Sequence, residues 1–341
     1  MTIEEIEQAC DAGLATDFSR HPLEAPQLTL EATFYPFGFP TLLRTNAPEI
    51  LTYARELWSM WEKRFDTSPI RVEVQVVDGD SEECPPTPSF HMMLPLLANI
   101  ADGNNLSIVN LAQSTTHITI TRATVQYPRY VKHFFLDAAP QGHIATRYTT
   151  PVHAGCVTLE GHGLLLCGDS GAGKSSLSYA CARAGFTYTT DDASFILHHD
   201  PAIHPGQALQ VTGNCYQVRF RPTASELFPE IDGLELTPRA AGKPSIELPT
   251  GPMPHVTSAQ TTEVRSLVFL NRRAAGPPEL RPYRKDVARH SLRQVHFGSP
   301  ESLAVQYQEI ERILNANIFE LRYTDINWAV DRLKKFIREG K

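Results

Sequence analysis

The nine-residue segment GDSGAGKSS, from Gly168 to Ser176, constrains this chain more than any other stretch. Gly168, Gly173, Lys174 and Ser175 complete the spacing G-x-x-x-x-G-K-[ST] of a phosphate-binding loop. Its glycines let the backbone take positive φ angles, so that N–H groups can turn inward toward phosphate oxygens. The lysine reaches the β- and γ-phosphates, and the serine hydroxyl binds Mg²⁺. The loop therefore predicts a nucleoside triphosphate site, with an ordinary glycine turn as the alternative.

Strand and helix patterns flank this loop in the order expected of an α/β fold. Residues 156–159 and 164–167 are typical of two strands, residues 175–184 of a helix, and Gly185 of the position just after a helix. Such a helix would direct the positive end of its dipole at the bound anion. The residues expected to line the nucleotide site are Gly168, Asp169, Ser170, Gly171, Ala172, Gly173, Lys174, Ser175 and Ser176.

Two adjacent aspartates follow the loop. Asp191 and Asp192 lie 17 and 18 residues after Lys174, and a helix followed by a short strand fits this interval. Both carboxylates would then lie at the carboxyl end of a strand, where open α/β sheets bind ligands. One could support Mg²⁺ and the other could accept a proton from an acceptor hydroxyl, the alternative being an acidic surface turn. His153 would return near the loop if the two preceding strands form a hairpin, and could orient an aspartate there.

The chain divides into two expected domains, 1–150 and 151–341. The first reads as a small α+β domain whose role the sequence does not indicate. Its expected elements are a helix with one apolar face over 48–65, a half-buried strand over 70–77, a turn-rich loop over 78–88 and a strand over 114–125. In the second domain we expect a strand over 186–197 that is interrupted at the two aspartates, a strand over 319–323, and a C-terminal helix capped by Asp325.

The overall charge and composition argue against several functions. The 341 residues carry a formal net charge of −7 and no long basic run, which argues against nucleic acid as a main partner. The N-terminal segment lacks the apolar core of a signal peptide, and no stretch reaches the apolar length of a membrane span. The six cysteines form no C-x-x-C pair, so we expect a reduced, cytoplasmic protein without structural zinc, whose thiols are buried and inert.

Two polar stretches are expected to be surface loops rather than sites. The stretch HHDPAIH contains His198, His199, Asp200 and His204, and its prolines favour a loop over a metal site. Residues 270–289 are locally basic, which favours a solvated loop over a docking surface for an acidic acceptor.

Three segments together resemble the catalytic domain of HPr kinase/phosphorylase. They are VHAG at 152–155, GLLLCGDSGAGKSS at 163–176 and AGFTYTTDD at 184–192. In that family a V-H-G segment, a G-D-S-G-x-G-K-S loop and an A-D-D pair recur at the same intervals. The resemblance is strong over about residues 150–200 and weak over 200–340. It implies a P-loop kinase core of the HPr kinase/PEP carboxykinase type, preceded here by the small α+β domain.

The resemblance also implies roles for individual residues. Lys174 would hold the transferred phosphate, Ser175 would bind Mg²⁺, Asp192 would be the general base, and His153 would assist it. Asp191 is then the aspartate left to support the metal or its waters. The family has a further metal-binding glutamate 25 residues after the second aspartate.

The sequence departs from the family pattern in two places. Gln217 stands at the glutamate position, and a neutral amide is a poorer Mg²⁺ ligand than a carboxylate. The family's later arginine-bearing loop has no match; Lys243 could supply a cation in its place, or be a solvated lysine in a turn. These departures weaken the expectation of a phosphorylase activity and of HPr as the substrate.

The expected function is an ATP- and Mg²⁺-dependent kinase. It would transfer phosphate to a hydroxyl, most simply the serine of a protein, a peptide or a small molecule. A nucleotide-binding regulatory or scaffold protein without turnover is the first alternative. A carboxykinase-like enzyme is the second, disfavoured because the chain is short for that class and has no matching carboxylate-binding arginine motif. The sequence leaves open the acceptor, the choice between ATP and GTP, and the formation of homo-oligomers.

Overall fold

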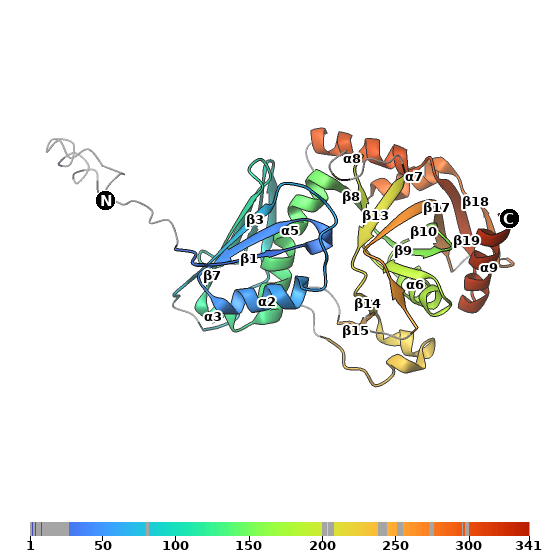
Figure 1. Cartoon of the computed structure of the whole chain (residues 1–341), viewed down its shortest axis with the longest axis horizontal. Helices are drawn as coiled ribbons and strands as arrows, with labels where there is room; N and C mark the ends of the chain where they lie inside the picture. The colour runs from blue at the N-terminus through green and yellow to red at the C-terminus, as the bar shows by residue number, and fades with distance from the viewer. Residues whose placement is uncertain are drawn as a thin grey trace.

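The chain is a mixed α/β protein, and its described residues form three sheets (Figure 1). The computed structural model describes residues 2, 4, 8, 27–79, 82–199, 203, 208–237, 244–250, 255–272, 276–294, 296 and 300–340. A seven-stranded sheet lies in the N-terminal part, a ten-stranded sheet in the C-terminal part, and a two-stranded sheet beside the latter. The first sheet ends at Thr121 and the second begins at Thr149. The division into domains at residue 150 stays a prediction.

The first sheet has the strand order β1-β2-β3-β7-β6-β5-β4. β2, β3 and β7 are parallel, and the other neighbours are antiparallel. Its strands are β1 (Leu30–Phe34), β2 (Thr41–Thr45), β3 (Ile70–Val77), β4 (Ser89–Met93), β5 (Leu96–Ile100), β6 (Leu106–Asn110) and β7 (Thr115–Thr121). The helical segments that accompany it are the 3₁₀ turn Pro36–Gly38, α2 (Pro48–Trp58), α3 (Arg122–Val125), α4 (Pro128–Val131) and α5 (Ala138–His143), with π-helical turns at Lys132–Asp137 and Ile144–Tyr148.

Local patterns in this part were predicted well, and helix ends less well. The strand expected over 70–77 is β3, whose apolar side chains alternate into the core as expected. The helix expected to reach Phe65 ends at Trp58. The prediction was wrong because Trp61 and Phe65 are buried for another reason: their rings pack on Phe37 and Phe39, with centroids 4.8 and 4.3 Å apart.

The strand expected over 114–125 is shorter in the structure, because residues 122–125 form a turn of helix instead. β7 ends at Thr121, whose hydroxyl accepts a hydrogen bond from the backbone N–H of Thr124 and begins α3. A threonine in this capping role converts the end of a strand into the start of a helix.

The second sheet has the order β16-β11-β9-β10-β17-β13-β12-β8, with β19 added beside β17 and β18 beside β19. Its strands are β8 (Thr149–Val152), β9 (Ala154–Leu159), β10 (His162–Cys167), β11 (Thr187–Thr190), β12 (Ser194–Leu197), β13 (Leu209–Gly213), β16 (Thr257–Ser258), β17 (Thr261–Asn271), β18 (Glu279–Pro282) and β19 (Asn317–Arg322). The two-stranded sheet joins β14 (Gln217–Phe220) to β15 (Ile246–Pro249), and short 3₁₀ turns follow at Pro222–Glu226 and Pro229–Ile231.

In the part of the chain that the structure describes, helices cover both faces of the second sheet (Figure 1). They are α6 (Lys174–Arg183), α7 (Lys285–Arg293), α8 (Pro300–Ile313) and α9 (Ile326–Glu339). Side chains of α6 and α9 share one apolar core, and side chains of α7 and α8 share another. The helix expected over 175–184 is confirmed as α6, followed by Gly185 at φ 96°. The cap at Asp325 is also confirmed, because its Oδ1 accepts the N–H of Trp328 at 2.8 Å.

The expected hairpin before the loop is confirmed. β9 and β10 pair antiparallel, with Leu159 opposite His162. The strand expected over 186–197 is confirmed as β11 and β12, interrupted at the aspartates. β11 pairs with β9 and β12 pairs with β8, so that the run 149–159 faces the run 187–197. Both runs break at the same level, one at His153 and the other at residues 191–193.

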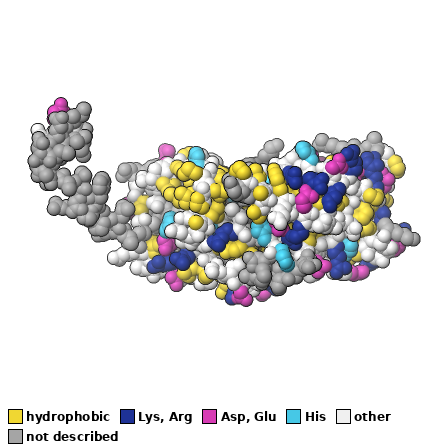
Figure 2. All heavy atoms as spheres, turned by 90° about the horizontal axis from the view of Figure 1, so that it is seen from above, with side chains coloured by type: hydrophobic (Ala, Val, Ile, Leu, Met, Phe, Trp, Pro, Cys, Tyr) yellow, Lys and Arg dark blue, Asp and Glu magenta, His cyan; other side chains and the backbone are white. Residues whose placement is uncertain are grey.

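One expectation for the surface was wrong. Residues 270–289 are not a loop, because β18 and the start of α7 lie within them. Three of the described arginines in this range pair with carboxylates: Arg281 with Glu320, Arg284 with Asp286 and Arg289 with Glu311. Figure 2 accordingly shows acidic side chains among the lysine and arginine side chains over α7 and α8.

The thiols are less uniform than expected. Cys156, Cys167, Cys181 and Cys215 are buried, and burial raises the pKa of each thiol, to about 12 for Cys156. Cys84 is exposed and lies in the proline-rich connection before β4. Cys10, Asp200, His204 and Lys243 lie outside the described residues. Among the described helices, none is long and apolar enough to cross a membrane.

Candidate active site

The phosphate-binding loop joins β10 to α6. Gly171 and Gly173 have φ angles of 86° and 97°, a region that only glycine adopts without strain. Gly173 is the N-cap of α6, and no side chain caps this end of the helix. A Cβ atom on Gly173 would lie 2.9 Å from Cδ of Arg272 and 3.0 Å from the hydroxyl of Tyr323. The N-terminus of α6 is therefore open to an anion, whereas any side chain at position 173 would be crowded by Arg272 and Tyr323.

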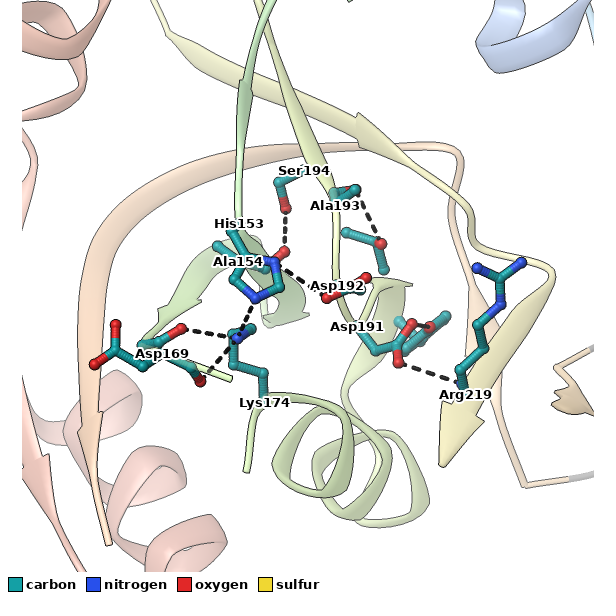
Figure 3. A network of polar contacts seen from close by, with 12 residues as sticks. His153, Ala154, Asp169, Lys174, Asp191, Asp192, Ala193, Ser194 and Arg219 are labelled. Atoms are coloured by element: carbon teal, nitrogen blue, oxygen red, sulfur yellow. Dashed lines mark hydrogen bonds and ion pairs between the residues drawn. The ribbon is translucent and has the colours of Figure 1, made fainter. Parts of the chain in front are cut away.

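Lys174 lies inside the loop. Its side chain is buried, with 6% of the residue exposed. Nζ donates to the carbonyl oxygens of Gly168 at 2.8 Å and Asp169 at 3.2 Å, and lies 2.9 Å from Nε2 of His153 (Figure 3). Burial lowers the pKa of Lys174, while the charge of Asp192 opposes that shift. The ammonium group is thus preorganised by loop carbonyls that a phosphate can replace.

His153 connects this lysine to Asp192. Its Nδ1 lies 3.1 Å from Oδ1 of Asp192, on the side of the ring away from Lys174 (Figure 3). An ammonium group can only donate, so Nε2 must be the acceptor in the contact with Lys174. The hydrogen-bond pattern therefore assigns the ring proton to Nδ1, where it is donated to Asp192. This hydrogen bond lowers the pKa of Asp192, which is kept ionised.

Asp191 has a different environment from its neighbour. It is 5% exposed, and its carboxylate accepts hydrogen bonds from the Tyr188 hydroxyl at 3.0 Å and from the backbone N–H of Arg219 at 3.3 Å. Ser175 donates to it as well. Burial raises the pKa of Asp191, and the negative charge of Asp192 adds to that shift. One aspartate is thus buried beside the loop serine, and the other is exposed on the side of His153.

The donor set fits a magnesium ion bound together with a nucleotide. The Ser175 hydroxyl and the Asp191 carboxylate are hard oxygen ligands, and Mg²⁺ in nucleotide sites uses one or two such groups plus phosphate oxygens. A nearby cation would also offset the cost of burying the Asp191 charge. The described residues contain no group of three or more His, Cys, Asp or Glu side chains that could hold a metal without a nucleotide.

A cavity of about 870 Å³ brings the predicted residues together. Most of the loop, His153, Asp191 and Asp192 line it. The structure adds three arginines that sequence analysis did not assign to the site, Arg219, Arg221 and Arg272. Arg272 is placed there because β10, β17 and β19 are parallel, so that their carboxyl ends meet. A long apolar strand followed by an arginine was the sequence signal for it.

The predicted metal ligand Gln217 lies elsewhere. It lines a second cavity of about 630 Å³, and its backbone carbonyl accepts the Tyr188 hydroxyl at 2.8 Å. Asp191, Asp192 and Arg219 line both cavities. The two cavities therefore meet at the aspartate pair.

Comparison with solved structures yields a weak likeness. No protein-family model matches the chain, and no curated protein matches it. The structure titled Hpr(Ser) kinase/phosphatase from Coxiella burnetii is 13% identical, with a TM-score of 0.30, covering 55% of this chain and 96% of that one. This likeness is too weak to assign a family, so the resemblance to HPr kinase/phosphorylase stays a prediction.

Proposed function

We propose that this protein is a Mg²⁺-dependent kinase that transfers the γ-phosphate of ATP to a hydroxyl group. The observation that supports it is the shared cavity: a phosphate-binding loop and an ionised aspartate with its own histidine line the same 870 Å³. Binding of nucleotide alone would not require a carboxylate held ionised there. Proton transfer from an acceptor hydroxyl does require one.

The loop and the arginines would bind the triphosphate. Backbone N–H groups at the start of α6 face the anion, and Lys174 exchanges its loop carbonyls for phosphate oxygens. Arg272, whose guanidinium lies over the Tyr323 ring at 5.9 Å, adds positive charge beside Gly173. The apolar side chains of Leu227 and Leu236 line the same cavity and suit a nucleobase. Mg²⁺, when bound by Ser175 and Asp191, would neutralise charge on the phosphates.

Asp192 would be the base for transfer. The acceptor oxygen forms a bond to the γ-phosphorus as its proton passes to the Asp192 carboxylate, and the bond from phosphorus to the β,γ-bridging oxygen breaks, leaving ADP with the electron pair. His153 would act as a positioning residue. It holds the carboxylate by its Nδ1–H, and its contact with Lys174 links the base to the group that holds the phosphate.

The experiment that tests this proposal is a screen of hydroxyl acceptors with ATP labelled at the γ-phosphate. The acceptors include seryl proteins, seryl peptides and small alcohols, with wild-type and Asp192→Asn proteins assayed side by side. Labelled product with the wild type, and a large loss with the variant, is expected. Binding of Mg-ATP with no labelled product, and ATP hydrolysis equal in both proteins, would instead indicate a nucleotide-sensing protein without turnover.

A further inference from the structure

The second cavity lies where the first sheet's helices meet the second sheet. Trp58 and Trp61 line it from the α2 side, and Asp137 lines it from the turn before α5. Its other wall comes from the residues around Asp192, from β14 and from β15. Apart from Asp191, Asp192 and Arg219, its lining differs from that of the nucleotide cavity. A molecule held here can therefore reach Asp192 while a nucleotide occupies the phosphate-binding loop.

Aromatic rings form a fixed wall of this cavity. Trp61 packs against Phe37 at 4.8 Å and edge-on against Tyr216 at 5.1 Å between centroids. The Tyr216 hydroxyl donates to the carbonyl of Met60 at 2.5 Å and accepts from Gln260 at 2.6 Å. These contacts join the two halves of the chain and hold the rings in place. A volume of about 630 Å³ is the size of a small-molecule site and is too small for a folded domain.

The titratable side chains around the cavity are mainly acidic. Among its described lining residues, five are carboxylates and one is an arginine: Glu56, Asp137, Asp191, Asp192, Glu247 and Arg219. Glu56 is paired with Lys132 at 2.8 Å, and Glu247 with Arg219 at 3.4 Å. Asp137 is half-buried and forms no ion pair with any residue that the structure describes. Burial raises its pKa, while a hydrogen bond with Gln141 and the charge of Arg219 oppose that shift, and a cation bound beside it would favour its ionised form. An ammonium group would find there both a carboxylate and aromatic faces that attract cations.

We infer that the second cavity is the acceptor site, and that the acceptor is a small hydroxyl compound that carries an ammonium group. This inference rests on the proposed function for the transfer step itself. The ammonium group would lie near Asp137 and the aromatic wall, with the hydroxyl at Asp192. The hydroxyl oxygen would then bond to the γ-phosphorus, its proton would pass to Asp192, and ADP would leave.

Tryptophan fluorescence provides a binding assay that does not depend on ATP. Trp58 and Trp61, two of the three tryptophans in the chain, line the cavity. The probes are phenylalaninol and its counterpart without the amine, 3-phenylpropan-1-ol. We expect phenylalaninol to bind about tenfold more tightly or better, because an ion-paired hydrogen bond is stronger than a neutral one. Asp137→Asn should abolish that advantage, and Asp331→Asn, on the exposed surface of α9, should leave it intact.

A second variant, Met60→Lys, keeps the inference testable if Asp137→Asn does not fold. Met60 is 47% exposed at the cavity, so Met60→Lys should fold and place a cation beside the site. It should weaken phenylalaninol about tenfold and leave 3-phenylpropan-1-ol unchanged. Equal affinity for the two probes, or an amine preference that survives both variants, would overturn the inference.

Turnover gives the remaining test. When a panel of alcohols is incubated with γ-labelled ATP, we expect label on the amino alcohols and not on their neutral counterparts. Label found only on neutral alcohols, or only on added folded proteins, would contradict the inference. Failure of the proposed function has a different signature. In that case phenylalaninol would still bind through Asp137, while Mg-ATP would not bind, or would bind without transfer to any acceptor.

Discussion

Nδ1 of His153 lies 3.1 Å from Oδ1 of Asp192, at the level where two facing runs of strand are both interrupted. The pairing of Cys156 with Thr190 on one side of the break, and of Val152 with Ser194 on the other, places His153 opposite the aspartates. Strand register therefore sets this contact. It gives Asp192 a hydrogen bond that lowers its pKa, whereas burial raises the pKa of Asp191.

Replacing Asp192 by asparagine should separate binding from transfer. The amide keeps the shape of the side chain and cannot accept a proton at neutral pH. We expect Mg-ATP to bind within a few-fold of wild type, while transfer falls by about 10²- to 10⁴-fold. Asp191→Asn is the matched comparison, and it should weaken the dependence on Mg²⁺ together with turnover. Isothermal titration and initial rates measure these effects; equal behaviour of the two variants would contradict the assigned roles.

Replacing His153 should change the pH dependence of the reaction. The hydrogen bond from His153 keeps the pKa of Asp192 below its ordinary value, so the base stays ionised as the medium becomes acidic. In His153→Ala that pKa should rise, and the acid limb of the kcat profile should move to higher pH. A purely structural role of His153 would lower kcat equally at every pH and leave the position of the limb unchanged.

Lys174→Ala should weaken ATP by at least an order of magnitude. A hydrogen bond to a charged group is worth about 1.5–3 kcal/mol, and the lysine is the buried cation of the loop. Lys335→Ala, an exposed lysine on α9, is the control and should bind ATP as wild type does. Calorimetry with Mg-ATP measures both. Unchanged affinity in Lys174→Ala would remove the basis of the nucleotide site.

Arg272→Ala should weaken ATP binding by about tenfold, because the variant removes a cation beside Gly173. Arg265 lies on β17, the strand that ends just before Arg272; it is exposed and pairs with Glu263, so Arg265→Ala is the control that should have no effect. The measurement is the KM for ATP at fixed Mg²⁺. An equal change in the two variants would point to general charge rather than to a phosphate contact.

His143 should make folding stability depend on pH. It is fully buried, and burial lowers its pKa from 6.5 to about 4, so the unfolded chain binds the proton more readily. Stability is therefore fully present above pH 6.5 and is lost as the pH falls toward 4, by about 3 kcal/mol for this group alone. Urea unfolding of wild type and His143→Gln at several pH values tests this; the variant should lose less stability over that range, and identical slopes would contradict the prediction.

The local features of the site could be predicted from the sequence because each depends on residues close together in the chain. The glycine spacing of the loop, the helix that follows, the interrupted strand at Asp191 and the cap at Asp325 all have short-range causes. Even the return of His153 follows from a two-residue hairpin between β9 and β10.

Other features needed the tertiary structure because they depend on which strands become neighbours. Arg272 reaches the loop because β17 lies beside β10, although about a hundred residues separate the two strands in the chain. The second cavity exists because Trp61, from the segment after α2, packs against Tyr216, just before β14. Periodicity in the sequence marks such residues as buried or exposed, and it carries no information on their distant partners. The sequence by itself thus determined a glycine-rich loop with the phosphate-binding spacing and an acidic pair after it, and only the packing of the two sheets decided what lies on the other side of that pair.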